Sequence, residues 1–459
     1  MNVYDIEPRV NGDVRIGASK GENVVWAGKL AERGNAEKIF FDGSDNFVVL
    51  EVGKRGSGKS YGMGSLLEGF AVAATSQIGT HSSRRAVLLL DPLDIHWTAL
   101  EPLRPDGPAA MARQYEVLAK WKDLKVEPLN VRVFVPGGYE LDIDPPNFAS
   151  YQLPVSDLDA ADWAHLLDCD LVLDPRGRMI DEVHRKVTGL GWARSGSSVA
   201  PAPIHSLQHL IDCAENDDDI VAFYHRETIR SVVQPLRAYA RMPLFASTTG
   251  TPLTTLVKEG VLTILSLARL PAALRTVLTT VLVRKLRADR MYASQILRRL
   301  GLHRTDAATR TRLEAELVNH VPRTILAIDE AQILMPAKGS SDTRKELDAF
   351  VLEGRNYGLS LWMATQRPKG AISGAAASQI DTFVVHRLSI EEDIEAVCGL
   401  LQNAQPSRMK LNGRTLDLPG LIRSLETGQA IFSSASSNIQ RFVVGMIRPR
   451  LVAHGGESF

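Results

Sequence analysis

Residues 47–60 read FVVLEVGKRGSGKS, and this stretch decides the fold class of the chain. An apolar run of strand length, residues 47–52, leads directly into residues 53–60, which fit the pattern GxxxxGK[ST] without a mismatch. A helix-like stretch follows at 60–74. A strand, a glycine-rich loop and a helix in this order are the setting in which the pattern binds phosphate.

The glycines of the loop let successive backbone N–H groups point inward around a phosphate, and the start of the helix adds positive potential. Lys59 is predicted to be catalytic, because it should reach the β- and γ-phosphates of ATP, and the Ser60 hydroxyl should bind Mg²⁺. The residues predicted to bind ATP are Gly53, Lys54, Arg55, Gly56, Ser57, Gly58, Lys59, Ser60 and Tyr61.

Short apolar runs recur along the chain, and helix-like stretches lie between many of them. The runs are 47–52, 86–90, 131–135, 261–267, 324–328, 359–364, 382–387, 429–432 and 441–447. Most are continuous rather than alternating, which is typical of strands buried on both faces. Strands that alternate with helices favour a largely parallel sheet covered on both sides. We therefore predict an α/β fold: a RecA-like P-loop NTPase core with a helical insertion.

The same pattern suggests how the chain is organised. Residues 1–45 are predicted to be a short β segment, too short for an independent barrel. Residues 46–154 form the first part of the core, and residues 251–447 its second part. Apolar residues recur at helical spacing in 155–250, which is the predicted insertion. Residues 448–459 are predicted to be a C-terminal tail.

Composition excludes several classes of protein. Lys plus Arg equals Asp plus Glu at 53 each, so any contact with DNA must come from a local basic surface. Cys169, Cys213 and Cys398 are far apart and form no CxxC pair, as expected in a reducing compartment. No signal pattern and no window of ~20 apolar residues is present. We expect a soluble, cytoplasmic protein without a membrane partner.

Two predicted strands, AVLLLD and TILAIDE, end in acids at Asp91 and at the pair Asp329 and Glu330. The pair is the better candidate because two acids serve two roles. Asp329 would orient Mg²⁺, and Glu330 would polarise the attacking water as general base. An adjacent glutamate suits a hydrolase, whereas a small-molecule kinase should avoid activating water. For Asp91, a strand-end turn and a role in the site both stay open.

Residues 353–368 read EGRNYGLSLWMATQRP and hold two further candidates. If the apolar run 359–364 lies beside the strand that precedes the phosphate loop, Gln366 falls at the carboxyl edge of the sheet. There it can hydrogen-bond the attacking water or the γ-phosphate. Arg355 precedes the run at the opposite end, so it can reach the ATP of a neighbouring subunit rather than its own.

The phosphate loop, DEAQ at 329–332 and GRNYGLSLWMATQRP at 354–368 resemble the HerA–FtsK superfamily of P-loop ATPases in order, spacing and chemistry. More diffuse similarity covers roughly residues 45–445. Members are usually hexameric rings that thread duplex DNA through a central pore. The resemblance implies that Lys59, Asp329, Glu330 and Gln366 act within one subunit. It makes Arg355 the arginine supplied in trans.

The chain is predicted to be HerA-like without a full N-terminal barrel and without the membrane helices usual in FtsK-like members. The resemblance implies an ATP-hydrolysing ring motor, a helicase-like translocase of duplex DNA that works with a partner nuclease or effector. A barrel-poor ATPase of this kind resembles those of bacterial antiviral defence systems. The alternative is an ATP-dependent scaffold that assembles and regulates an effector without moving DNA.

Two basic stretches are candidates for contact with DNA. Residues 284–312 contain nine Lys and Arg and two acids, and a phosphate-binding surface and a solvated helix face or subunit contact are both open readings. The stretch 335–348 follows the acidic strand. The family resemblance places such a loop near the pore, which makes Lys338, Arg344 and Lys345 candidate DNA contacts.

Overall fold

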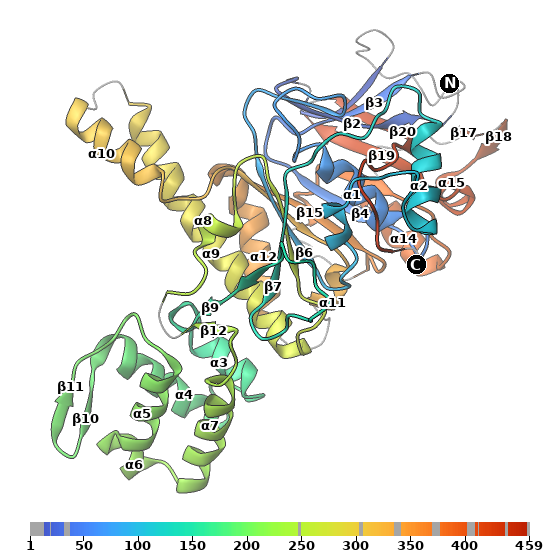
Figure 1. Ribbon diagram of the computed structural model, residues 1–459. Coiled ribbons are helices and arrows are strands. Elements are labelled where there is room, and N and C mark those ends of the chain that lie inside the picture. The colour runs from blue at the N-terminus through green and yellow to red at the C-terminus, as the bar shows by residue number, and fades with distance from the viewer. Residues whose placement is uncertain are drawn as a thin grey trace. The chain divides into compact units, whose positions relative to one another are not determined.

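The computed structural model describes residues 13–18, 20–31, 37–246, 249–302, 306–334, 341–369, 377–401, 409–411, 413–436 and 439–456. The chain divides into two compact units (Figure 1). The first unit comprises Met1–Val133, Val257–Ala268 and Leu286–Phe459, and the second comprises Phe134–Leu256 and Arg269–Lys285.

The first unit is built on one large sheet. Its strands are β1 (Val14–Gly17), β2 (Asn23–Leu30), β3 (Lys38–Asp42), β4 (Val48–Val52), β5 (Gly79–His81), β6 (Ala86–Asp91), β13 (Leu262–Ser266), β14 (Thr324–Ile328), β15 (Leu359–Thr365), β16 (Thr382–Val385), β19 (Gln429–Ser436) and β20 (Ile439–Ile447). A separate small hairpin pairs β17 (Met409–Leu411) with β18 (Arg414–Leu416). Strand β7 (Val131–Pro136) begins in this unit and ends in the second.

The centre of the sheet has the order β16-β4-β15-β14-β6-β13, and all of these neighbours are parallel. Every residue of these six strands is buried. Continuous apolar runs fit such positions because helices cover both faces of a parallel sheet. The prediction of an α/β, RecA-like core with a mostly parallel sheet is confirmed.

One side of the sheet is mostly antiparallel, although β1 and β3 at its end pair in parallel. Strand β19 pairs with β16, β20 with β19, β2 with β20, and β3 with β2, all antiparallel. The described residues before position 45 therefore extend the sheet of the core through the β2–β20 pair. They do not form a body of their own, which explains how so short a segment can bury residues such as Trp26 and Ile39.

The first unit also contains helices. They are α1 (Lys59–Glu68), the 3₁₀ turn η2 (Trp97–Leu100), α2 (Ala109–Ala119), α10 (Ala307–Leu317), α11 (Ala331–Leu334), α12 (Ser341–Gly354), the 3₁₀ turn η5 (Arg355–Tyr357), α14 (Glu391–Leu400) and α15 (Leu418–Ser424). The long helix α9 (Ala272–Leu300) begins in the second unit and ends in the first. No helix in the described parts of the chain has the length and apolar character needed to cross a membrane.

The chain after β20, which its sequence suggested was a tail, is packed into the core of the first unit as far as it is described. Arg448, Arg450 and Leu451 are buried. Glu68 at the end of α1 accepts hydrogen bonds from Arg448 Nη1 at 3.1 Å and Arg450 Nε at 2.7 Å. The sequence Arg-Pro-Arg at 448–450 is typical of an exposed chain end. Both arginines can be buried here because they share the carboxylate of Glu68, which lies far away in the sequence.

The second unit is mostly helical. Its helices are the 3₁₀ turn η3 (Val155–Asp157), α3 (Ala160–Leu166), α4 (Pro175–Arg185), the π-helical turn η4 (Lys186–Leu190), α5 (Leu207–Asn216), α6 (Asp218–Phe223), α7 (Arg226–Tyr239) and α8 (Leu253–Leu256). Its short strands are β8 (Ala149–Tyr151), β9 (Leu153–Pro154), β10 (Trp192–Arg194), β11 (Ser197–Val199) and β12 (Phe245–Ala246). The core of this unit includes Met179 of α4, Leu210 of α5 and Leu236 of α7, which are all buried.

Candidate functional site

Four parallel strands bring the candidate residues to one edge of the sheet. Strands β4, β15, β14 and β6 lie side by side in this order, so the loops after their carboxyl ends meet. This is the edge where open α/β sheets bind ligands. Gln366 follows β15 directly beside the phosphate-loop strand, as the sequence suggested. The acidic strand β14 is one place further away, because β15 lies between it and β4.

The phosphate loop has the backbone geometry that its glycines allow. Gly56 and Gly58 have φ of 76° and 97°, the left-handed region that glycine adopts without strain. The residue at the start of α1 is Gly58, which has no side chain, so it does not cap the N–H groups of the first turn. At Gly53, a Cβ atom would lie 2.5 Å from Ser57 Oγ, so this position has room only for glycine.

The flanks of the loop are held by main-chain contacts. The Lys54 N–H donates to Arg387 O at 3.0 Å, and the Ser57 N–H donates to Lys54 O at 3.1 Å. Arg55 is exposed. The Tyr61 hydroxyl accepts a hydrogen bond from the Arg450 N–H at 2.9 Å, so its side chain supports the core and only its main chain borders the loop.

Lys59 lies between the two acids of the DEAQ motif. Its Nζ is 3.2 Å from Asp329 Oδ1 and 2.8 Å from Glu330 Oε1. All three side chains are buried. Burial favours the neutral amine, but the charges of Asp329 and Glu330 outweigh it and raise the pKa of Lys59. Lys59 is therefore a cation, and it is held beside the phosphate loop by the carboxylates of Asp329 and Glu330.

Asp329 is held as a carboxylate although it is fully buried. Burial by itself raises its pKa, but the charge of Lys59 and hydrogen bonds that include those of His96 and Ser60 together place the pKa well below its usual range. His96 Nε2 is 3.0 Å from Asp329 Oδ2. The hydroxyl of Ser60 and an ionised carboxylate thus lie together, as the sequence suggested for a Mg²⁺ site.

Glu330 is positioned by two amide side chains and by its own backbone. Gln366 Nε2 donates to Glu330 Oε1 at 2.8 Å, and Gln332 Nε2 donates to Oε2 at 2.5 Å. Thr365 Oγ1 donates to Gln332 Oε1 at 2.8 Å, which fixes that amide. The φ of Glu330 is 46°, a left-handed conformation that is costly for a residue with a side chain and occurs most often at functional sites.

His96 is the site residue that sequence reasoning missed. The carboxylate of Asp91 accepts hydrogen bonds from the N–H groups of Leu93, Ile95 and His96 at 3.0, 2.9 and 2.7 Å. Asp91 therefore shapes the turn after β6, and this turn delivers His96 to Asp329. The only signal in the sequence is an aspartate at a strand end followed by a histidine within one turn, a pattern too common to stand out.

Arg355 lies where the sequence indicated, before β15 and at the edge of the sheet opposite Gln366. Its Nη2 is 2.6 Å from Asp381 Oδ2, and its side chain is 45% exposed, so it is accessible from outside this chain. The carbonyl of Arg355 accepts a hydrogen bond from Asn46 Nδ2 at 2.7 Å.

The three candidate DNA contacts near 335–348 are described only in part. Lys338 lies outside the described residues. Arg344 and Lys345 lie in the first half of α12, half-buried and exposed respectively.

The basic stretch 284–312 begins with cations that are engaged within the chain. Arg290 is buried and donates to the carbonyls of Tyr357 and Val321. The ion pairs of the others are Arg284 with Asp159 and Asp162, Lys285 with Asp157, and Arg287 with Glu346 and Glu353. These contacts favour a structural role for the start of this stretch over a phosphate-binding surface.

Oxygen donors at this edge suit a hard cation. Among the described residues, no group of three or more His, Cys, Asp and Glu has the arrangement of a metal site. Mg²⁺ commonly takes only one or two protein ligands and completes its octahedron with phosphate oxygens and water. Ser60 and Asp329 fit that role.

No family model and no curated protein matches the sequence. Among solved structures, the chain is similar to VirB4 of Thermoanaerobacter pseudethanolicus, with a TM-score of 0.51 and 15% identical residues over 93% of this chain and 98% of that one. It also matches the plasmid coupling protein TrwB in complex with ADP and Mg²⁺, with a TM-score of 0.47 and 13% identity over 90% and 88% of the two chains. The first likeness shows that this chain and VirB4 share a fold.

Proposed function

We propose that this protein hydrolyses ATP at the edge of the sheet where Lys59, Glu330 and Gln366 meet. The observation that carries this proposal is the placement of Glu330, whose two carboxylate oxygens accept hydrogen bonds from Gln366 and Gln332. A general base must be oriented and must lie near the phosphate that water attacks; Glu330 is oriented by these two hydrogen bonds, and its Oε1 is 2.8 Å from Nζ of Lys59, the proposed phosphate-binding lysine.

The chemistry follows from these positions. The N–H groups of the phosphate loop bind the β-phosphate, and Lys59 moves its charge from the acids to the β- and γ-phosphates when ATP binds. Glu330, released from Lys59, accepts the proton of the attacking water, while Gln366 orients the carboxylate or the water. Mg²⁺ held by Ser60 and Asp329 would neutralise charge on the β- and γ-phosphates.

The proposed substrate of the motor is duplex DNA. This step rests on the motif resemblance to HerA–FtsK ATPases, and the fold shared with VirB4 is consistent with it. We propose a homo-oligomeric ring, of six subunits by the same resemblance, that moves or remodels duplex DNA with a partner nuclease or effector, in the setting of antiviral defence.

Linear duplex DNA is expected to raise the steady-state rate of ATP hydrolysis by the purified protein. In a translocase, product release or the closing of subunit interfaces is coupled to DNA, so DNA accelerates the slow conformational step. The measurement is phosphate release with and without DNA at saturating ATP and Mg²⁺.

Turnover that ignores DNA would support the second candidate instead, an ATP-dependent scaffold that assembles and regulates an effector. The exposed Arg355 is compatible with it, because an arginine in trans makes assembly depend on ATP whether or not DNA moves. Sedimentation with and without ATP, in the absence of DNA, then measures whether ATP drives assembly.

Replacing His96 by alanine is expected to raise the Mg²⁺ concentration needed for half-maximal ATP hydrolysis by about 10–100-fold, the usual cost of losing a group that orients a metal ligand. The rate at saturating Mg²⁺ should fall less, because Asp329 itself remains. The control is His320→Ala, which removes a histidine paired with Asp289 at 2.8 Å away from the phosphate loop. An unchanged Mg²⁺ requirement in His96→Ala would show that Asp329 does not depend on His96.

A further inference from the structure

Helix α7 of the second unit carries a row of arginines on one face. Arg226, Arg230 and Arg237 lie in the helix, and Arg241 follows two residues after its end. At 3.6 residues per turn, the three helical positions fall within an arc of about 40°, and Arg241 lies in the turn that follows the helix. Gln234 lies on the same side of the helix between Arg230 and Arg237, at the one position of the row that is not an arginine. We call these four arginines the α7 stripe.

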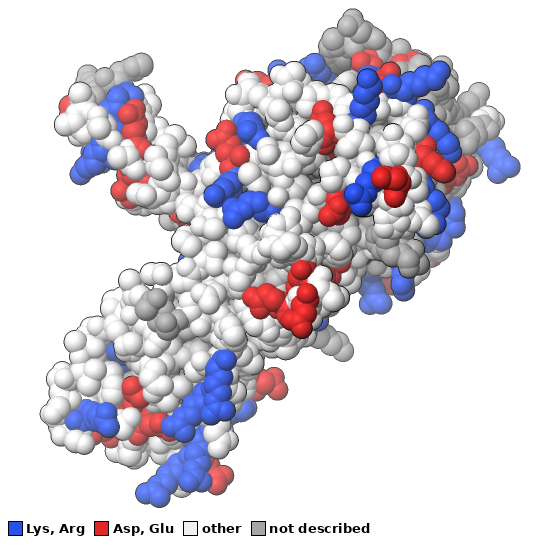
Figure 2. Space-filling view, in the orientation of Figure 1, with Lys and Arg blue, Asp and Glu red and all other residues white. Residues whose placement is uncertain are grey.

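The stripe is exposed, while the opposite side of the helix is not. All four arginines are exposed, whereas Leu236 of the same helix is buried in the unit's core. Figure 2 shows Lys and Arg side chains gathered on the side of this unit along which α7 runs in Figure 1, with a few acidic side chains beside them.

Most of the stripe's charge is not used inside the chain. Arg237 pairs with Glu215 at 2.7 Å and remains 54% exposed. Among the described residues, no ion pair involves Arg226, Arg230 or Arg241. Several other cations of this unit are paired, as Lys186 is with Asp217 at 2.5 Å. The stripe therefore presents positive charge that the fold does not need for its own stability.

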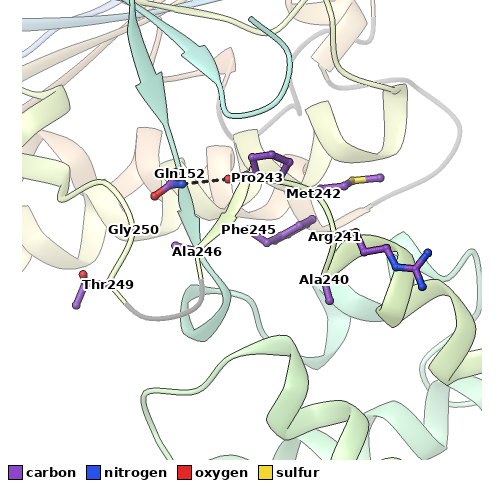
Figure 3. A pocket seen from close by; sticks show the side chains of 9 residues that line it. All are labelled: Gln152, Ala240, Arg241, Met242, Pro243, Phe245, Ala246, Thr249 and Gly250. Atoms are coloured by element: carbon purple, nitrogen blue, oxygen red, sulfur yellow. Dashed lines mark hydrogen bonds between the residues drawn. The ribbon is translucent and has the colours of Figure 1, made fainter.

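The last member of the stripe borders a shallow pocket of about 360 Å³ that includes Gln152, Pro243 and Thr249 in its lining. Figure 3 shows the Arg241 side chain extending away from Gln152 and Thr249 rather than into the space between them. Arg241 is thus directed outward, as a surface contact requires, and the pocket is not its target.

We propose that Arg226, Arg230, Arg237 and Arg241 bind the phosphate backbone of duplex DNA. A rise of 1.5 Å per residue spreads the three helical arginines over about 16 Å, a length along which a duplex presents roughly ten phosphates. The guanidinium group matches phosphate oxygens with two parallel hydrogen bonds. The inference rests on the proposed function, since duplex DNA is the polyanion that the proposed motor handles.

An acidic protein is the other possible partner of a basic row, and the composition of the stripe argues against it. Protein interfaces have aromatic and apolar side chains at their centre. The residue between the arginines of the stripe is Gln234, a polar side chain suited to phosphate contacts. Long cations at one-turn and two-turn intervals without an apolar centre are typical of backbone binding.

The test is the equilibrium binding of fluorescent duplex DNA to the full chain, measured by anisotropy at several salt concentrations without ATP. The quadruple variant R226A/R230A/R237A/R241A is expected to bind roughly 10–100-fold more weakly at low salt, because it loses about four phosphate contacts. The slope of log affinity against log salt should flatten by about one for each arginine removed. Alanine favours the helix, so α7 should stay folded.

The matched control is R104A/R185A/R414A/R423A, which removes the same charge from exposed arginines outside the stripe. It should keep the affinity and salt slope of the unmodified protein, whereas the stripe replaced by four lysines should keep the salt slope, because the charge is the same, and lose part of the affinity, because lysine lacks the paired hydrogen bonds of the guanidinium group. Equal losses in the stripe and control variants, or unchanged binding in the stripe variant, overturn the proposal. If the protein binds DNA through the stripe but hydrolyses no ATP, the proposed role of the stripe stands and the proposed ATPase activity is refuted.

Discussion

Replacement of Glu330 by glutamine is expected to lower the rate of ATP hydrolysis by about 10²–10⁴-fold, the usual contribution of a positioned general base. Glutamine has nearly the shape of glutamate and can still contact Lys59 and Gln366. It cannot accept the proton of the attacking water. ATP affinity should therefore be kept or increased, because the variant also removes one negative charge near the γ-phosphate.

The measurement combines phosphate release with the binding of a fluorescent ATP analogue. The control is Glu314→Gln on α10, where a half-exposed carboxylate lies 3.8 Å from Arg310 and away from the phosphate loop. Hydrolysis at the normal rate by Glu330→Gln would mean that another group activates water. Loss of ATP binding together with hydrolysis would mean that the variant disturbs the loop rather than the chemistry.

The parts of the site that could be predicted from the sequence are those coded by short, local patterns. The glycines of the phosphate loop are required by its backbone, as the φ of 97° at Gly58 shows. Asp329 follows an apolar run directly and Gln366 follows one after a single residue, so their place at the carboxyl edge follows once the strands are parallel. Local order along the chain was sufficient for these residues.

The parts that could not be predicted depend on pairings between distant segments. The sheet topology places β15 between β4 and β14, and the residues of no single apolar run specify this order. His96 meets Asp329 only because β6 lies beside β14. Arg448 is buried because Glu68, 380 positions earlier, accepts its hydrogen bond.

Arg355 to alanine is expected to lower ATP turnover of the assembled protein by about 10³–10⁵-fold, the effect of removing an arginine that stabilises the transition state from a neighbouring subunit. Arg355 lies at the edge of the sheet opposite Lys59, so it cannot serve the ATP of its own chain. Binding of ATP to the isolated subunit should therefore be unchanged.

Arg355→Ala also removes the ion pair between Arg355 and Asp381, so a loss of activity could come from the broken ion pair as well as from the missing arginine. Burial raises the pKa of Asp381, and the charge of Arg355 opposes that shift. The matched control is therefore Asp381→Asn, which removes the ion pair but keeps the arginine. If Asp381→Asn loses as much activity as Arg355→Ala, the ion pair rather than the arginine explains the loss.

Mixing two inactive variants distinguishes a residue in trans from one in cis. Lys59→Ala subunits cannot bind the γ-phosphate productively but still present Arg355, and Arg355→Ala subunits have the opposite defect. In a head-to-tail ring assembled at random from equal amounts, roughly one interface in four combines an intact Lys59 with an intact neighbouring Arg355. Activity should therefore return on mixing, up to about a quarter of the normal rate. No recovery, in mixtures shown to form joint rings, would place Arg355 outside the neighbour's site, because in a trans arrangement the intact parts of both variants must meet at some interfaces.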